Sequence, residues 1–344
     1  MPKGEYLQYG GQALMEGVMM RSPRYFSVAC RAPNGQILVE TEAIDKTWIG
    51  RQNWLKLPFL RGTLALLDAI ALGAKAMRFS TNVQLDERYQ PESEDGKERE
   101  KVSEEQAAKD RKIQDAVVFW TLVLSFVFAV LLFDYAPNAI AEQLRRWNIH
   151  DGRIINVATE CTKLVMLGGY VALISRMKEI KEVFKYHGAE HKAINTLEAD
   201  EPLTMENCKK QTRLHPRCGT SFAVIVLILG FCVFPFVPRY PVTGHQGNML
   251  LDVSVRTLLE ILILPIIASV AYELIRLAGK FRNQGFVMAL FKPGLLSQYV
   301  TTREPTEEQI EVALTALKAC IEAEEHGLAP AKAAEPEMAL EAGT

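Results

Sequence analysis

Residues 220–237 read TSFAVIVLILGFCVFPFV, an apolar run without a charged side chain. A helix needs about 20 residues to cross the roughly 30 Å hydrocarbon core of a bilayer, so this run is close to spanning length. Three further apolar runs are of similar length: Ala116–Ala136, Ile154–Ile174 and Thr257–Ile275. The sequence therefore predicts a mainly α-helical, multi-pass membrane protein with about four transmembrane spans.

Two of these runs contain ionisable residues. Glu160 and Lys163 lie three positions apart in the second run, where they could neutralise each other inside a bundle, and Glu260 lies in the fourth. Lesser functional candidates are Arg61 and Asp68 in a preceding amphipathic segment, and Glu273, which we expect to extend to the membrane interface.

Basic residues are concentrated in alternate loops. They precede the first run, follow the fourth, and crowd the loop between the second and third, whereas the other two loops contain few. Because basic residues favour the cytoplasmic side, both termini and the loop between runs two and three are predicted to be cytoplasmic.

Composition narrows the range of partners. The 344 residues include 39 Lys and Arg against 41 Asp and Glu, which gives no reason to expect nucleic acid as a partner. Mean hydropathy is +0.02 although 23% of the residues are charged, so very apolar segments alternate with very polar ones. The six cysteines show no paired spacing, which argues against a disulfide framework.

The remaining segments flank the bundle. Asn34-Gly35 lies between two apolar-polar alternating stretches and predicts a β-hairpin, and Thr306-Glu307-Glu308-Gln309 is a capping box before an apolar helical face. The predicted organisation is a small β-containing unit (1–56), an amphipathic helix (57–79), a charged linker (80–112), the transmembrane bundle with a cytoplasmic His-rich loop (113–282), C-terminal amphipathic helices (283–325) and a disordered tail (326–344).

The cytoplasmic loop contains His187-Gly-Ala-Glu190-His191, an H-x-x-E-H motif. On a helix, positions four apart share one face, so His187 and His191 could bind one metal ion, with Glu190 as the general base. We expect this helix to continue the second span, and zinc to be the divalent ion. The alternative is a basic juxtamembrane helix whose histidines lie at the level of the lipid headgroups.

A second group of candidate residues precedes the third span. His215-Pro-Arg-Cys218 has the spacing of metal ligands, and Cys218 would lie at a helix N-terminus, where the helix dipole favours a thiolate. His215 or Cys218 could complete the metal site. Cys218 could instead be a nucleophile, with His191 or His215 as its base, or a buried structural thiol.

A third candidate is Glu16, the only acidic residue between Tyr6 and Glu40. It lies in the glycine-rich stretch GGQALMEGVMMR (10–21), among apolar residues, where burial would be costly without a partner. Glu16 could be a catalytic or metal-binding carboxylate. The alternative is an ordinary glycine turn in which Glu16 is paired with Arg21.

Four motifs together resemble a known family: GGQALMEGVMMR (10–21), YHGAEHK (186–192), HPRCGTSF (215–222) and TREP (302–305). They are similar to those of the YqhQ-like family of bacterial membrane proteins, over residues 5–323. The resemblance implies a multi-pass protein of the cell inner membrane and a predicted metal-dependent enzyme, with a metal at His187, Glu190, His191, His215 and Cys218. It implies no substrate.

The sequence thus favours a metal-dependent hydrolase at the cytoplasmic membrane face, with the lipid bilayer as a partner and a homo-oligomer left open. One alternative is a hydrolase or transferase that uses Cys218 as its nucleophile. The other is a non-enzymatic scaffold, transporter component or assembly factor, because four spans and amphipathic helices would also suit the docking of partner proteins.

Overall fold

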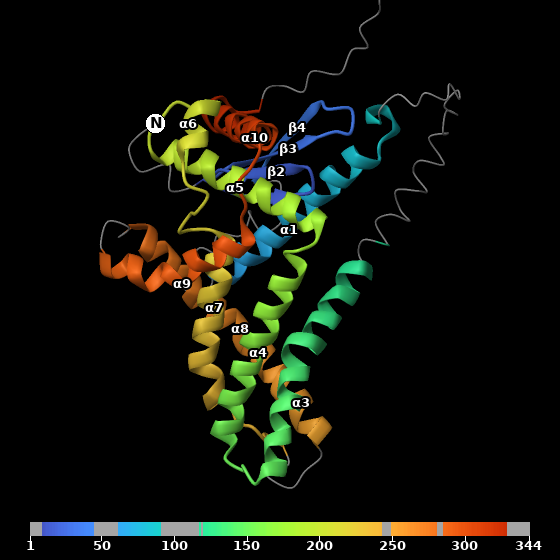
Figure 1. Cartoon of the computed structure of the whole chain (residues 1–344), viewed down its shortest axis with the longest axis vertical. Coiled ribbons are helices and arrows are strands. Elements are labelled where there is room, and N and C mark those ends of the chain that lie inside the picture. The colour runs from blue at the N-terminus through green and yellow to red at the C-terminus, as the bar shows by residue number, and fades with distance from the viewer. Residues whose placement is uncertain are drawn as a thin grey trace, which may run out of the picture.

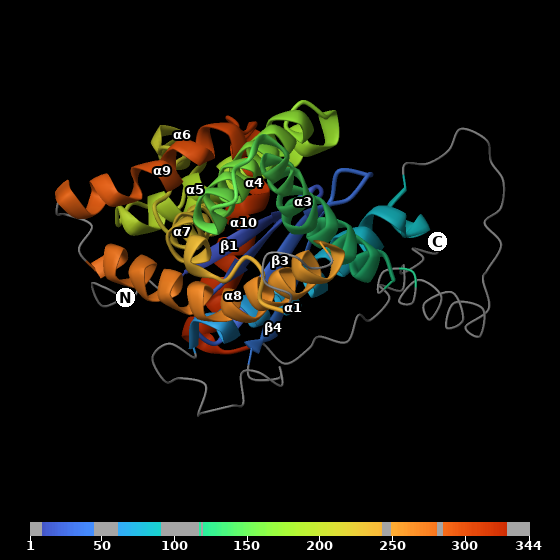
Figure 2. The same ribbon diagram turned by 90° about the horizontal axis from the view of Figure 1, so that it is seen from below.

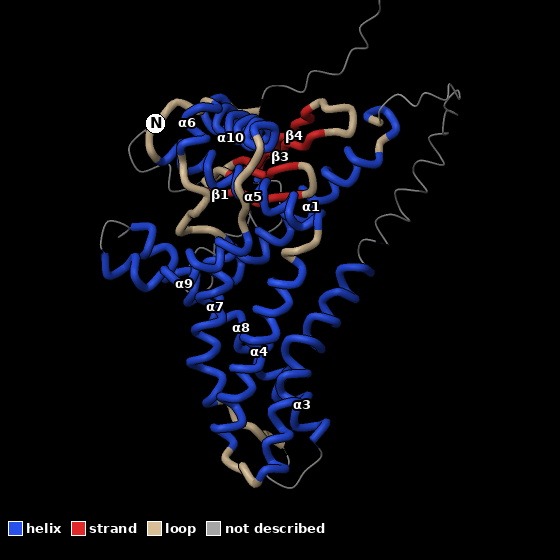
Figure 3. The backbone as a smooth tube through the Cα atoms, viewed as in Figure 1, coloured by secondary structure: helices blue, strands red, loops and turns tan. Residues whose placement is uncertain are grey.

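The computed structural model describes residues 9–44, 61–90, 117, 120–242, 249–280 and 285–328. A small sheet covered by helices lies at one end of the longest axis, and a bundle of long helices forms the other end (Figures 1 and 3). The fold is mainly helical, as predicted. Most of the predicted charged linker and nearly all of the predicted disordered tail lie outside the described residues.

The sheet has four antiparallel strands in the order β1-β2-β3-β4. The predicted hairpin is confirmed: β3 (Tyr25–Arg31) and β4 (Ile37–Ala43) flank Asn34-Gly35, and Gly35 has a φ of 88°. The other two strands, β1 (Gly10–Leu14) and β2 (Gly17–Arg21), lie in the glycine-rich stretch. Glycine is uncommon in strands, so the sequence pattern of this stretch indicated only a turn.

Helices cover both faces of the sheet. On one face, Val18 and Met20 pack against α5 (Lys178–Glu198) and α10 (Glu307–His326). On the other, Met19 packs with residues of α1 (Arg61–Leu85). Adjacent residues of β2 therefore enter two different cores, which explains why this strand is apolar on both sides.

Helix α10 packs against the N-terminal sheet. The capping box of Thr306 and Gln309 forms as predicted, and the apolar face of α10 lies in the core. Near the end of α10, the Glu324 carboxylate accepts a hydrogen bond of 2.7 Å from Ser22 Oγ and one of 2.6 Å from Arg24 Nε. The C-terminal helix is thus an integral part of the N-terminal unit.

Within the described part of the chain, four helices have the length and composition to cross a membrane: Trp120–Trp147, Gly152–Ile174, Gly219–Phe236 and Leu250–Arg276. The first contains a π-helical segment η5 (Leu131–Tyr135), α3 (Ala136–Glu142) and η6 (Gln143–Trp147). The others correspond to α4 (Gly152–Ile174), to α7 (Gly219–Val233) with η7 (Phe234–Phe236), and to α8 (Met249–Lys280). Figure 2 views them from below, with the sheet behind. Their apolar side chains are largely exposed, as expected for a protein whose partner is the lipid bilayer.

Three further helices complete the described fold: the short η4 (Glu87–Tyr89) and α6 (Met205–Lys210), and the longer α9 (Gly285–Thr301), which packs against α7. One expectation is wrong, because α5 does not continue the second span. Helix α4 ends at Ile174, and Met177 is extended before α5 begins. The break is held by Arg303, whose guanidinium donates to the carbonyl of Ser175.

Candidate metal centre

Three side chains meet where the sheet unit joins the bundle, and they come from two helices that are separated in the sequence. His187 and His191 lie one turn apart on α5, and Cys218 is the residue that caps the N-terminus of α7. One donor atom from each lies within 4.8 Å of the others, and His187 Nε2 is 3.0 Å from Cys218 Sγ. We call His187, His191 and Cys218 the donor triad.

Backbone carbonyls orient both imidazoles. His187 Nδ1 lies 2.9 Å from the carbonyl oxygen of Thr301, and His191 Nδ1 lies 2.6 Å from that of Arg213. A carbonyl acceptor fixes the proton on Nδ1, which leaves Nε2 available as a ligand atom. His191 is 1% exposed, and its Nε2 makes no hydrogen bond with a described residue. Burial lowers the pKa of His191, so its imidazole is held in the neutral form.

Glu190 lies beside the donor triad and packs against β1. It is 5% exposed, and its Oε2 makes no hydrogen bond with a described residue. A Cβ atom on Gly11 would come within 2.9 Å of the Glu190 side chain, so glycine allows the close approach of β1. Burial raises the pKa of Glu190 to about 8, although His187 and the backbone amide of Gly11 favour its charged form.

Cys218 has features of both a ligand and a nucleophile. Its sulfur accepts a hydrogen bond of 3.4 Å from the amide of Thr220 in the first turn of α7. Burial opposes ionisation of the thiol, but the neighbouring His191 and Thr220 outweigh it and lower the pKa of Cys218. In contrast, burial raises the pKa of Cys30 to about 12 and that of Cys208 to about 11. All six cysteines are free thiols.

The structure places His215 next to the donor triad but does not bring its ring into it. The His215 and His191 ring centres are 5.7 Å apart, and His215 Nε2 lies 3.3 Å from Glu198 Oε1. Glu198 also forms an ion pair with Arg217. These contacts anchor the segment that leads into Cys218.

Glu16 lies at the turn between β1 and β2, with a positive φ of 52°. Its Oε2 accepts a hydrogen bond of 3.0 Å from the hydroxyl of Tyr186, the residue before His187. Arg21 instead pairs with Asp68 on α1 at 2.5 Å. Glu16 therefore contacts the metal-site helix through Tyr186, and the expected partner of Glu16 in the alternative interpretation, Arg21, is bound elsewhere.

Glu273 has a partner that the sequence did not indicate. It forms a two-pronged ion pair with Arg61 at the start of α1. Gly62 packs directly against Ser269 and Tyr272 of the same span, and Thr63 hydrogen-bonds to Ser269. Two of the lesser candidates thus fasten α1 to α8.

Sequence reasoning missed two residues that position the site. Arg303 uses its backbone amide to bond the carbonyl of Phe184 at 2.9 Å, and its own carbonyl lies against Gly188, where a Cβ atom would overlap it. Gln298 is fully buried and bonds both the amide and the carbonyl of His215. The TREP motif was a signal for Arg303, whereas nothing in the sequence distinguished Gln298.

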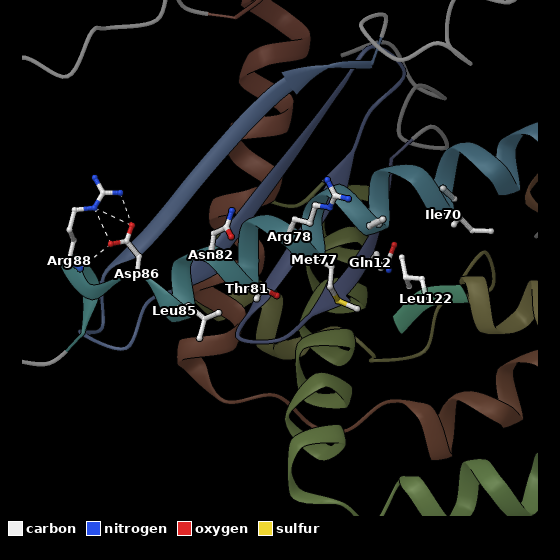
Figure 4. A pocket seen from close by; sticks show the side chains of 13 residues that line it. Gln12, Ile70, Met77, Arg78, Thr81, Asn82, Leu85, Asp86, Arg88 and Leu122 are labelled. Carbon is white, nitrogen blue, oxygen red and sulfur yellow. Dashed lines mark hydrogen bonds and ion pairs between the residues drawn. The ribbon is translucent and has the colours of Figure 1, made fainter. Parts of the chain in front are cut away.

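A groove of about 1170 Å³ runs along α1 close to the first span (Figure 4). Gln12, Met77, Arg78 and Leu122 are among its lining residues, which combine polar and apolar groups. Gln12 is adjacent in β1 to Gly11, which packs on Glu190.

Comparisons with known proteins identify the family. Residues 57–323 match the family model described as "Protein of unknown function (DUF1385)". The chain is 34% identical over 308 residues to "Uncharacterized protein YqhQ" of Bacillus subtilis (strain 168), covering 89% of this chain and 90% of that protein. No solved structure matches. The chain therefore belongs to the DUF1385 family and is YqhQ-like.

Proposed function

We propose that the donor triad binds a divalent metal ion, with zinc as the first candidate, and that the protein is a metal-dependent hydrolase at the cytoplasmic face of the membrane. The observation that carries the proposal is the convergence of three donor atoms within 4.8 Å, with both Nδ1 atoms bonded to backbone carbonyls. A metal-ligating histidine almost always donates its second ring N–H in this way.

The donor set fits zinc. Bond lengths of about 2.0–2.3 Å in a tetrahedral site place ligand atoms about 3.3–3.8 Å apart, so small side-chain rotations would complete the geometry. The buried His191 Nε2 without a hydrogen-bond partner among the described residues is an atom that a metal would satisfy. Three protein ligands are also the number typical of catalytic zinc sites, which keep one position for water or substrate.

Glu190 would supply the acid-base chemistry. A bound zinc ion would act as a Lewis acid and favour deprotonation of water. Glu190 would accept that proton and return it to the leaving group, because its buried carboxyl lies beside the donor triad and a bound cation would favour its charged form. Glu16 would position α5 through Tyr186, and His215 and Glu198 would hold Cys218 in place.

The location supports a substrate close to the membrane. The distribution of basic residues supports a cytoplasmic location for both termini and the donor triad, and an inner-membrane location would follow for a bacterial chain. The groove along α1 reaches Gln12, next to the strand that packs on Glu190, and Leu122 of the first span lines its other side. A lipid or peptide bond at the membrane surface could enter there.

Inductively coupled plasma mass spectrometry of the purified protein tests the proposal. We expect about one metal ion per chain, lost in the double variant His187→Ala/His191→Ala. The control is His326→Ala, an exposed histidine at the end of α10. Absence of stoichiometric metal in the wild type, or equal metal in the double variant, would contradict the metal site.

The short contact between Cys218 and His187 favours a second candidate, a cysteine hydrolase or transferase. Alkylation of Cys218 by iodoacetamide near neutral pH separates the two. A thiolate nucleophile should react equally with and without zinc, whereas a metal ligand should be protected by zinc and exposed by a chelator. Cys208 provides an internal control, because burial raises its pKa to about 11.

A further inference from the structure

A buried ionic cluster lies inside the membrane spans, distant in sequence from the donor triad. Lys163 of α4 is 2.5 Å from Asp134 of the first span and 3.5 Å from Glu160, and it also pairs with Glu260 of α8. The predicted Glu160–Lys163 pair is thus confirmed, and two more carboxylates join it. Arg256 completes the group, with its Nε 2.7 Å from Glu260. We call these five residues the Lys163 cluster.

Hydrogen bonds connect the Lys163 cluster to the loop at the far end of the bundle. Asn138 Oδ1 accepts bonds from Arg256 at 3.1 Å and from Arg239 at 2.6 Å. Arg239 is engaged by Glu142, whose other oxygen accepts from Tyr240 at 3.0 Å and from Arg145 at 3.2 Å. Glu142 is thus shared by two guanidiniums outside the Lys163 cluster: that of Arg239, whose side chain is 3% exposed and needs a buried counter-charge, and that of Arg145, which is 31% exposed and partly solvated.

The charges within the Lys163 cluster do not balance. Three carboxylates face one ammonium and one guanidinium, which leaves one negative charge in excess if all are ionised. Arg256 is fully buried, and Glu160 and Glu260 are 5% and 3% exposed. An uncompensated charge is costly where water is excluded, and a proton on one carboxyl would remove it.

Buried oxygens mark where such a proton could be held. Asp134 Oδ2 and Glu160 Oε1 make no hydrogen bond with a described residue, and the contact of Glu160 with Lys163 is the longest of the three. A carboxylate in this setting becomes neutral by accepting one proton from a hydronium ion, which forms the carboxyl O–H bond and leaves a water molecule. Ionisable groups inside membrane spans commonly form proton or ion pathways.

We propose that the Lys163 cluster is a proton-binding site within the membrane: one carboxyl among Asp134, Glu160 and Glu260 is protonated at neutral pH and exchanges its proton with water on the side of the Arg239 loop. The proposal is independent of the metal centre, since it rests on groups in three spans that do not contact the donor triad.

Infrared spectroscopy of the full-length protein in detergent tests the proposal through the C=O stretching band of a protonated carboxyl. The measurement uses Glu190→Gln protein, because burial raises the pKa of the Glu190 carboxyl to about 8 and its own acid band would overlap. We expect a carboxylic-acid band at neutral pH that shifts in heavy water. The five residues of the Lys163 cluster are unaltered in this protein, so absence of the carboxylic-acid band would overturn the proposal.

Variants of the cluster then test the charge argument. Each of Glu160→Gln, Asp134→Asn and Glu260→Gln leaves two carboxylates facing two cations and should remove the band, whereas Lys163→Met should about double it, because a second carboxyl must be neutralised. Glu273→Gln is the matched control, since Glu273 lies on the same helix as Glu260 but is paired with Arg61. Circular dichroism checks the fold. A band unchanged in all three carboxyl variants would also overturn the proposal.

Discussion

His187 Nε2 lies 3.0 Å from Cys218 Sγ, although 31 positions separate the two residues. His187 belongs to a helix packed on the sheet, whereas Cys218 begins a transmembrane helix. The donor triad therefore lies across the joint between the two parts of the molecule, and a bound ion would hold that joint together.

Zinc should accordingly stabilise the protein against unfolding. At a free concentration about 100 times its dissociation constant, a ligand of the folded state adds about 2.7 kcal/mol. Thermal unfolding in detergent, followed with and without zinc, measures this effect. The His187→Ala/His191→Ala variant should show no zinc-dependent shift, and the same shift in that variant would exclude the donor triad as the binding site.

The metal-free protein should become less stable as the pH rises. Burial raises the pKa of Glu190 from 4.5 to about 8, so its contribution is fully present below about pH 4.5 and is lost as the pH rises through 8. The loss is at most about 5 kcal/mol. Unfolding of chelator-treated protein across this range checks it. Glu190→Gln should have a flatter profile, and identical profiles would refute the assignment.

Gly188→Ala should damage both the fold and the metal site. A methyl group at this position would overlap the carbonyl of Arg303, which is backbone and cannot rotate away. Overpacking of this kind costs about 1–3 kcal/mol and would tilt α5, which carries both histidines. Unfolding and metal content report the effect. The control is Gly168→Ala on α4, where no atom lies within 4 Å of an added Cβ, and equal loss in the two variants would contradict the explanation.

The contact between α10 and the sheet should weaken in acid. Partial burial opposes ionisation of Glu324, but hydrogen bonds from Ser22 and Arg24 outweigh it and lower its pKa. Its contribution is therefore present above the unfolded pKa of about 4.5 and is lost as the pH falls through the lower folded value. We expect about 1 kcal/mol, because Arg24 is largely exposed. Proteolysis at α10 should therefore increase in acid in the wild type. The Glu324→Gln variant should lack this pH dependence.

Local patterns in the sequence predicted most of the fold. The length of the apolar runs revealed the four spans. Asn34-Gly35 revealed the hairpin, and Thr306 with Gln309 revealed the start of α10. The strands of the glycine-rich stretch were missed because their apolar residues serve two cores, and no single alternation marks them. The break after α4 was missed because it depends on Arg303, more than a hundred positions away.

The candidate site was predictable only in part. Helical spacing places His187 and His191 on one face, but the approach of Cys218 depends on how α7 docks beside α5. His215 has the same residue type and a similar sequence context, yet Glu198 holds its ring outside the donor triad. Such a choice among neighbouring candidates is made by tertiary contacts, which spacing does not encode.

The pairing of α10 with the N-terminal sheet has a consequence for biosynthesis. The strands are made before the four spans, but the helix that covers one of their faces is made after them. Until then, Val18 and Met20 lack part of their apolar cover. The nascent chain must keep this face from aggregating throughout membrane insertion, and the sheet unit can close only once α10 has been made.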